Sequence, residues 1–165
     1  MHAFYLDASA LAKRYVPEIG SPLVDEVLDN VPADRIYVVN VGAGEVVSIL
    51  VRKRNAGVIT DAYFRQALVD FETEIVRSRD INKLPVGNRL ATSSFSLIVA
   101  HSINSTDAIT LRSALAIALK LRAGGDDLVL VASDLRLLHA AQAEGLITFN
   151  PESQDHAALA ALLGP

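Results

Sequence analysis

The fold is decided by residues 3–13, which read AFYLDASALAK. Four apolar residues, 3–6, end at Asp7, and an alanine- and leucine-rich stretch begins after Ser9. A short apolar run bounded by a polar break is typical of a buried strand, and the stretch after it is typical of a helix. The pattern therefore predicts a strand with Asp7 at its carboxyl end, where crevices form in open α/β sheets.

Asp7 and Ser9 also have a simpler interpretation, since either residue type commonly caps a helix. Recurrence of the pattern favours a functional role. Asp134 follows an apolar strand and precedes a helix, and Asp107 lies in the first turn of an apolar helix. Glu45 begins another apolar helix. The simpler interpretation of Glu45 is a solvent-exposed residue in the first turn, where the helix dipole favours a negative charge.

Predicted strands and helices alternate along the rest of the chain. Besides residues 3–6, strands are expected at 35–39, 128–132 and 146–149. Helices are expected after Ser9 and at 21–30, 45–54, 60–79, 90–103, 105–121, 135–141 and 155–163, with breaks at 40–44 and 82–87. This order predicts one domain over residues 1–165, an α/β three-layer sandwich with helices on both faces of a central, mostly parallel sheet.

Composition narrows the classes of protein and of site. Of the 165 residues, 51% are hydrophobic and 5% aromatic, as in a core of aliphatic strands covered by helices. There is no cysteine, which excludes disulfides and thiolate metal sites. The net charge of −4 argues weakly against a basic coat for nucleic acid without excluding such a substrate. No signal peptide or long apolar run is evident, so we expect a cytoplasmic protein without a membrane partner.

In a parallel sheet, Asp7 and Asp134 leave the same edge, and Asp107 and Glu45 can converge on them. Like charges about 4 Å apart repel by roughly 1–4 kcal/mol per pair, so the cluster makes sense only with cations. Oxygen ligands select Mg²⁺ or Mn²⁺. Such ions can activate water against a phosphodiester. No phosphate-binding glycine loop is present to support a nucleotide-cofactor site.

Several basic residues lie near these acids in the sequence and are candidate contacts to substrate phosphates. Each also has a simpler interpretation as a solvated surface charge. The candidates are Lys13, Arg14, Arg52, Arg112 and Arg136.

Taken in order, the motifs resemble the PIN-domain family, and within it the chain is most similar to VapC-type toxins. The likeness rests on residues 5–11 (YLDASAL), Glu45 in a helix after the second strand, residues 106–109 (TDAI) and residues 131–138 (VASDLRLL). Each motif alone is weak, but their order and spacing together are fairly specific.

The resemblance implies a divalent-metal-dependent endoribonuclease, the toxin of a type II toxin–antitoxin pair, that hydrolyses RNA phosphodiesters with Mg²⁺ or Mn²⁺. It also implies a small antitoxin partner and a homodimer. By the same implication, Asp7 and Asp107 are the most direct metal ligands. The implied site consists of the catalytic and metal-binding acids Asp7, Glu45, Asp107 and Asp134 with the supporting polar residues Ser9, Thr106 and Ser133.

Two other functions compete with this one. A phosphatase-like or receiver-like domain would use Asp7 as a nucleophile, but it would want a second acid where Ser9 stands. A catalytically inactive PIN-fold module that binds RNA or protein is the alternative from another class. Asp126 and Asp127 precede their strand and are left out of the site, and His101 has no second histidine at metal-ligand spacing.

Overall fold

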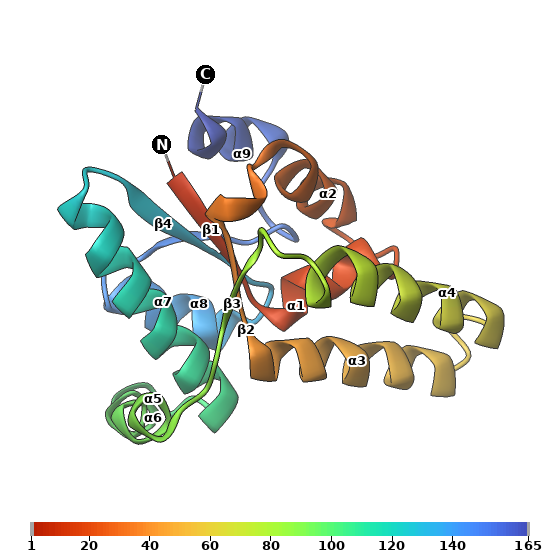
Figure 1. Cartoon of the computed structure of the whole chain (residues 1–165), viewed down its shortest axis with the longest axis horizontal. Helices are drawn as coiled ribbons and strands as arrows, with labels where there is room; N and C mark the ends of the chain where they lie inside the picture. Colours follow the sequence, from red (N-terminus) through yellow and green to blue (C-terminus); the bar gives the residue numbers. More distant parts are fainter. Residues whose placement is uncertain (1, 165) are drawn as a thin grey trace.

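A central sheet of five parallel strands runs through the computed structural model, which describes residues 2–164 (Figure 1). Met1 and Pro165, the ends of the predicted domain, lie outside the described residues. In spatial order the strands are β3 (Asn82–Leu84), β2 (Ile36–Val39), β1 (His2–Leu6), β4 (Asp127–Val131) and β5 (Ile147–Phe149). The predicted strand 3–6 is thus the middle strand, and Phe4 pairs with both Ile36 and Val129.

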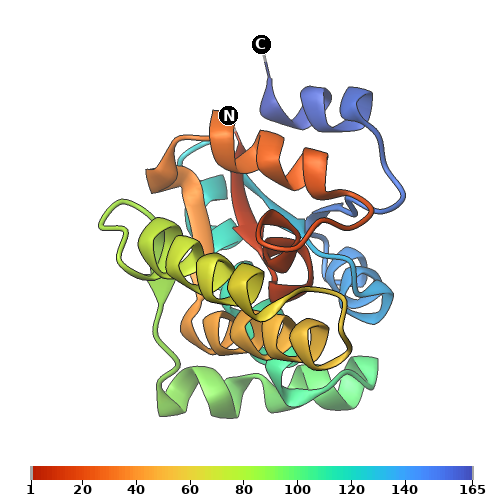
Figure 2. The ribbon, with the colours of Figure 1, turned by 90° about the vertical axis from the view of Figure 1, so that its right-hand side faces the viewer.

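Helices cover both faces of the sheet, which confirms the three-layer α/β/α fold. Side chains alternate along β1, so Phe4 and Leu6 enter one core and Ala3 and Tyr5 the other. The first core is covered by α1 (Ala8–Leu11), α2 (Ser21–Asn30), α3 (Asn40–Asn55), α4 (Asp61–Phe71) and α9 (His156–Leu163). Figure 2 looks onto this layer, with α2, α4 and α3 in front of the strands.

The opposite core is covered by α6 (Phe95–His101), α7 (Ser105–Ala123) and α8 (Leu135–Ala143), while α5 (Asn88–Ser93) packs on α7. Short turns of 3₁₀-helix lie at η1 (Ala12–Arg14) and η2 (Ala33–Arg35), and a π-helical turn, η3 (Glu72–Val76), extends α4. Within residues 2–164, no helix combines the length and apolarity needed to cross a bilayer.

The structure corrects the sequence predictions at several boundaries. Residues 82–84 form the edge strand β3 where a break was expected, because backbone pairing to Tyr37–Val39 holds this polar segment in the sheet. The expected helix 90–103 is divided at Ser94, whose hydroxyl bonds to the carbonyl oxygen of Ala91 at 2.6 Å. The expected helix 60–79 ends as the π-turn at Val76.

The helix after β2 starts earlier than its glycines suggested. It begins at Asn40 directly after the strand, so the expected loop 40–44 is helical. Gly42 is buried against Val39, where an added Cβ would lie 3.3 Å from a Val39 methyl carbon, so this close contact suits glycine despite its low helix propensity. Glu45 consequently lies in the second turn of α3, not in the first.

Candidate active site

A cleft of about 340 Å³ brings the four predicted acids together. It lies where β1 and β4 end and where α3 and α7 begin. Its lining comprises Asp7, Ala8, Ser9, Glu45, Ser48, Ile49, Arg52, Asn104, Asp107 and Asp134. Residues separated by more than one hundred positions in the sequence therefore share one cavity, because all strands of the sheet are parallel and their carboxyl ends face the same way.

Asp7 is the most deeply placed of the acids, with 7% of its surface exposed. It caps α1, and one carboxylate oxygen accepts hydrogen bonds from the Ser9 amide at 3.0 Å and the Ser9 hydroxyl at 2.7 Å. Burial raises the pKa of Asp7, while the Ser9 donors lower it and the charge of Asp134 raises it further. Asp7 therefore both caps α1 and lines the cleft.

Ser9 links the ends of the two central strands. Its Oγ donates to Asp7 and accepts from the Ser133 amide at 2.9 Å. Ser133 therefore supports the site through its backbone N–H, and its own buried Oγ has no hydrogen-bond partner within residues 2–164.

Glu45 and Thr106 connect α3 with α7 across the cleft. Burial raises the pKa of Glu45, and the negative charge of Asp7 raises it further. Hydrogen bonding by Thr106 and the positive charge of Arg52 act in the opposite direction. Glu45 therefore lines the cleft with the other acids, one turn further into its helix than expected, whereas Thr106 supports Glu45 without lining the cleft.

Asp107 is held by a residue that the sequence analysis missed. Asn104, rather than Ser105 or Thr106, caps α7, accepting from the Asp107 amide at 2.9 Å and donating from Nδ2 to the Asp107 carboxylate at 2.8 Å. The signal was present, because asparagine is among the strongest N-cap residues. Burial, together with the charges of the other three acids, raises the pKa of Asp107 to about 7, and Arg136 opposes this rise.

Asp134 caps α8, where its Oδ1 accepts from the Arg136 amide at 2.8 Å and the Leu137 amide at 3.2 Å. This cap fixes the carboxylate at the start of the helix. Its charge acts on both Asp7 and Asp107. The negative charges of the four carboxylates repel one another in every pair. The metal-free cleft therefore has an unfavourable electrostatic energy.

The five basic candidates divide into two groups. Arg52 lines the cleft, and Arg136 acts on Asp107 from the start of α8. Lys13 instead is buried, with its ammonium 2.6 Å from Glu152 and 3.3 Å from Glu18. Arg112 joins α7 to the preceding helices through Ser93 and Ser96.

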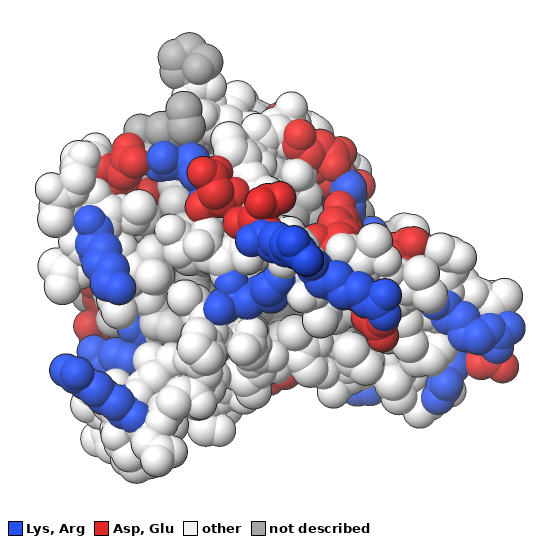
Figure 3. Space-filling view, in the orientation of Figure 1, with Lys and Arg blue, Asp and Glu red and all other residues white. Residues whose placement is uncertain are grey.

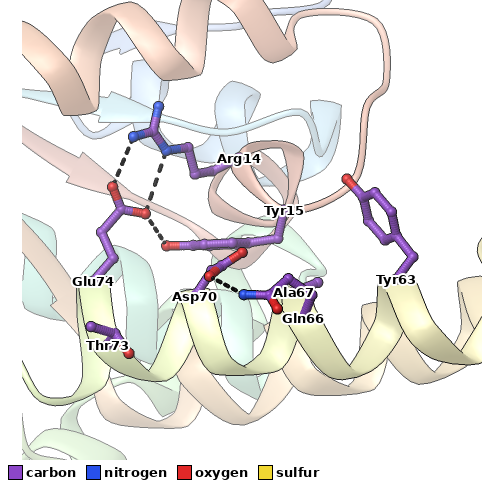
Figure 4. A pocket seen from close by; sticks show the side chains of 8 residues that line it. All are labelled: Arg14, Tyr15, Tyr63, Gln66, Ala67, Asp70, Thr73 and Glu74. Carbon is purple, nitrogen blue, oxygen red and sulfur yellow. Dashed lines mark hydrogen bonds and ion pairs between the residues drawn. The ribbon is translucent and has the colours of Figure 1, made fainter.

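Arg14 belongs to a separate and larger cavity of about 470 Å³ between η1 and α4. Figure 4 shows its guanidinium beside Glu74, which also accepts from the hydroxyl of Tyr15 at 2.8 Å. Asp25 and Asp29 complete its ion pairs at 3.1 and 2.8 Å. Lys13, Arg14 and Arg112 are therefore engaged in the fold, and only Arg52 and Arg136 stand at the acidic cleft.

The donor set of the cleft fits a hard divalent cation. Four carboxylates without any cysteine or histidine among the lining residues suit Mg²⁺ or Mn²⁺, and a cation would relieve their mutual repulsion. Within residues 2–164, no group of three or more Asp, Glu or His side chains is placed so that it could hold a metal ion as it stands. The fit to a divalent cation therefore rests on the chemistry of the donors.

No protein-family model matches the sequence, and no curated protein matches it. The structure, by contrast, is similar to solved ones. PAE2754 from Pyrobaculum aerophilum has a TM-score of 0.62 and 16% identity, covering 98% of this chain and 95% of its own. VapC20 from Mycobacterium tuberculosis, a toxin that cleaves the sarcin-ricin loop, has a TM-score of 0.60 and 16% identity, covering 93% and 100%.

A third similar structure is FitAcB from Neisseria gonorrhoeae, with a TM-score of 0.58 and 16% identity over 92% of this chain and 99% of that one. Identities this low establish the fold and leave activity to be argued from the cleft. The arrangement of a five-stranded parallel sheet between two helical layers agrees with the motifs of residues 5–11 and 131–138. The chain has the PIN-domain, VapC-type fold.

Proposed function

We propose that this chain is a divalent-metal-dependent endoribonuclease that hydrolyses RNA phosphodiesters and acts as the toxin of a type II toxin–antitoxin pair. The observation that carries the proposal is the shared cleft of Asp7, Glu45, Asp107 and Asp134, acids drawn from four separate parts of the chain. Four carboxylates that repel one another lower the stability of the fold, so stability does not explain why they share a cleft. A site for a cation does explain it, because the cation offsets the repulsion.

Asp7 and Asp107 would hold the cation, with Asp134 and Glu45 beside them. A bound Mg²⁺ or Mn²⁺ supplies an activated water and neutralises charge on the phosphodiester. The chain's own residues prepare the cleft for it. Ser9 and Asn104 orient the two ligand carboxylates by the hydrogen bonds described above, and such supporting bonds commonly matter ten- to a hundredfold for metal affinity.

Two arginines support a polyanionic substrate despite the net charge of −4. Arg52 lines the cleft from α3, and the positive charge of Arg136 on α8 acts on Asp107, so both would contact substrate phosphates. Lys and Arg side chains also gather over the segment that joins η3 to β3 (Figure 3), which contains the exposed Arg77 and Arg79. This segment precedes a parallel strand, so it lies at the amino ends of the strands, away from the cleft, and does not enter the proposal.

The toxin assignment carries three further expectations. The likeness to VapC20, a toxin, supports a small antitoxin partner. A homodimer would cover exposed apolar side chains on the α6–α7 layer, where Phe95 is 58%, Val99 83% and Leu119 73% exposed. Toxins directed at RNA act where RNA is, and we therefore place the protein in the cytoplasm.

The experiment is RNA cleavage by Asp7→Asn in the presence of Mg²⁺ or Mn²⁺. Asparagine keeps the helix cap of α1 but removes a charged ligand, so we expect a folded protein without cleavage. Asp61→Asn is the matched control, because Asp61 is an exposed carboxylate in the first turn of α4 and does not line the cleft. Wild-type turnover by Asp7→Asn would remove Asp7 from the mechanism and favour an inactive binding module instead.

A further inference from the structure

A further hollow, of about 290 Å³, lies along α8, the helix that Asp134 of the acidic cleft caps. It is formed by α8, by β5 and by the turn at 150–154 that follows β5. None of the described residues that line it is Asp, Glu, Lys or Arg. An uncharged hollow of amides, hydroxyls and two leucines would not retain a phosphate, but it suits a flat, uncharged group with polar edges.

Two glutamine amides in this hollow are held in defined orientations. Gln142 donates from Nε2 to Thr148 Oγ1 at 2.8 Å, which leaves its Oε1 as an acceptor. Gln154 accepts on Oε1 from the Asn150 amide at 2.7 Å, which leaves its Nε2 as a donor. The hollow thus presents one fixed acceptor and one fixed donor, the combination that matches the edge of a nucleobase.

Helix α8 links the hollow with the acidic cleft, because its cap residue lines the cleft and its later residues line the hollow. Asp134 caps this helix, and Leu135, His139 and Gln142 follow at positions that share one helix face. At 1.5 Å per residue, His139 lies about 7.5 Å along the helix from Asp134. That places the hollow within reach of a nucleotide next to one whose phosphate lies at the acids.

Leu135 and His139 supply surfaces that nothing in the described chain covers. Leu135 is 59% exposed next to Asp134, and the imidazole of His139 makes no hydrogen bond or ion pair to any of residues 2–164. The positive charge of Arg136, one position after Leu135, acts on Asp107. A strand of RNA would therefore meet a cation at its phosphate and an uncharged hollow at its base.

We propose that the hollow binds one nucleobase of the RNA adjacent to the scissile phosphate and so sets the base preference of cleavage. This inference rests on the proposed ribonuclease function and deepens it. Leu135 and His139 would contact the face of the base, and Gln142 with Gln154 would read its edge. Recognition of unpaired bases by side-chain amides and by flat or apolar surfaces is the usual means of sequence-specific RNA binding.

The experiment digests a randomised RNA library with wild type, Gln142→Ala, Gln154→Ala and His139→Ala, and the cut ends are sequenced. Wild type should favour one base at a fixed position beside the cut. Each glutamine variant should lower kcat/KM for the preferred base by roughly two- to tenfold, the effect of one neutral hydrogen bond, and flatten the preference. Gln66→Ala is the matched control, because Gln66 lines the separate cavity between η1 and α4.

The outcomes separate the two proposals. Cleavage by wild type with a base preference that all three variants retain would overturn the base site and leave the ribonuclease intact. No cleavage by wild type with either metal would overturn the ribonuclease, and the base site with it. A preference altered in Gln142→Ala and Gln154→Ala but kept in Gln66→Ala, with unchanged melting temperatures, supports the inference.

Discussion

Ser9→Ala is a sharp test of how the cleft is built. The hydroxyl makes two hydrogen bonds, donating to Asp7 at 2.7 Å and accepting from the Ser133 amide at 2.9 Å. Each is worth about 1 kcal/mol, so their loss should lower the free energy of unfolding by about 2 kcal/mol. For a chain of this length, that corresponds to a fall in melting temperature of about 4–8 °C.

Urea and thermal unfolding measure this loss directly, and a manganese titration measures its second consequence. Without the Ser9 donor, the Asp7 carboxylate is less well oriented, so we expect Mn²⁺ affinity to fall about tenfold or more. Ser48→Ala is the control, because Ser48 lines the same cleft but its hydroxyl bonds only to Gly44 of its own helix. A loss below about 0.5 kcal/mol, or equal losses in both variants, would refute this account of the cleft.

Three further predictions concern pH, packing and charge. The free energy of unfolding of the metal-free protein should fall as pH rises from about 4 to above 7. The reason is that the pKa of Asp107 is raised to about 7 in the fold, whereas the unfolded chain releases this proton at lower pH. Urea unfolding at a series of pH values measures this dependence, and Asp107→Asn should flatten it. Gly20→Ala should lower the free energy of unfolding by about 2 kcal/mol or more, since φ is +89° and the added Cβ would meet the Pro151 carbonyl oxygen at 2.4 Å, a loss that thermal melts would detect. Lys13→Met should destabilise the fold by roughly 1–3 kcal/mol, measured by urea unfolding, because Glu152 loses its cation and Glu18 keeps Lys53 alone. Arg52→Ala should change stability by less than about 0.5 kcal/mol and weaken RNA binding in a filter-binding assay.

Local sequence patterns predicted the elements whose burial decides their conformation. The apolar runs of β1 and β4 are buried on both faces, and their ends placed Asp7 and Asp134 at one edge. The edge strand β3 escaped prediction because Asn82 and Lys83 are polar and their strand conformation comes from pairing with β2. Tertiary context of this kind cannot be read from a local pattern.

The acids were easier to predict than their basic neighbours. A carboxylate that ends a buried strand has its position fixed by the backbone, as for Asp7. A lysine or arginine has a long side chain whose direction depends on partners elsewhere in the chain. Lys13 reaches Glu152 and Arg14 reaches Glu74, so closeness in sequence to Asp7 said little about where their charges lie.

The central claim is that acids from distant parts of the chain form one site for a divalent cation, and the melting temperature as a function of Mn²⁺ tests it most directly. At a free concentration one hundred times Kd, binding should add about 2.7 kcal/mol and raise the wild-type melting temperature by about 5–11 °C. Asp7→Asn and Asp107→Asn should each lose most of this rise, while Asp61→Asn keeps it. A wild-type melting temperature that does not respond to Mn²⁺ or Mg²⁺, or acid variants that respond as wild type does, would contradict the claim.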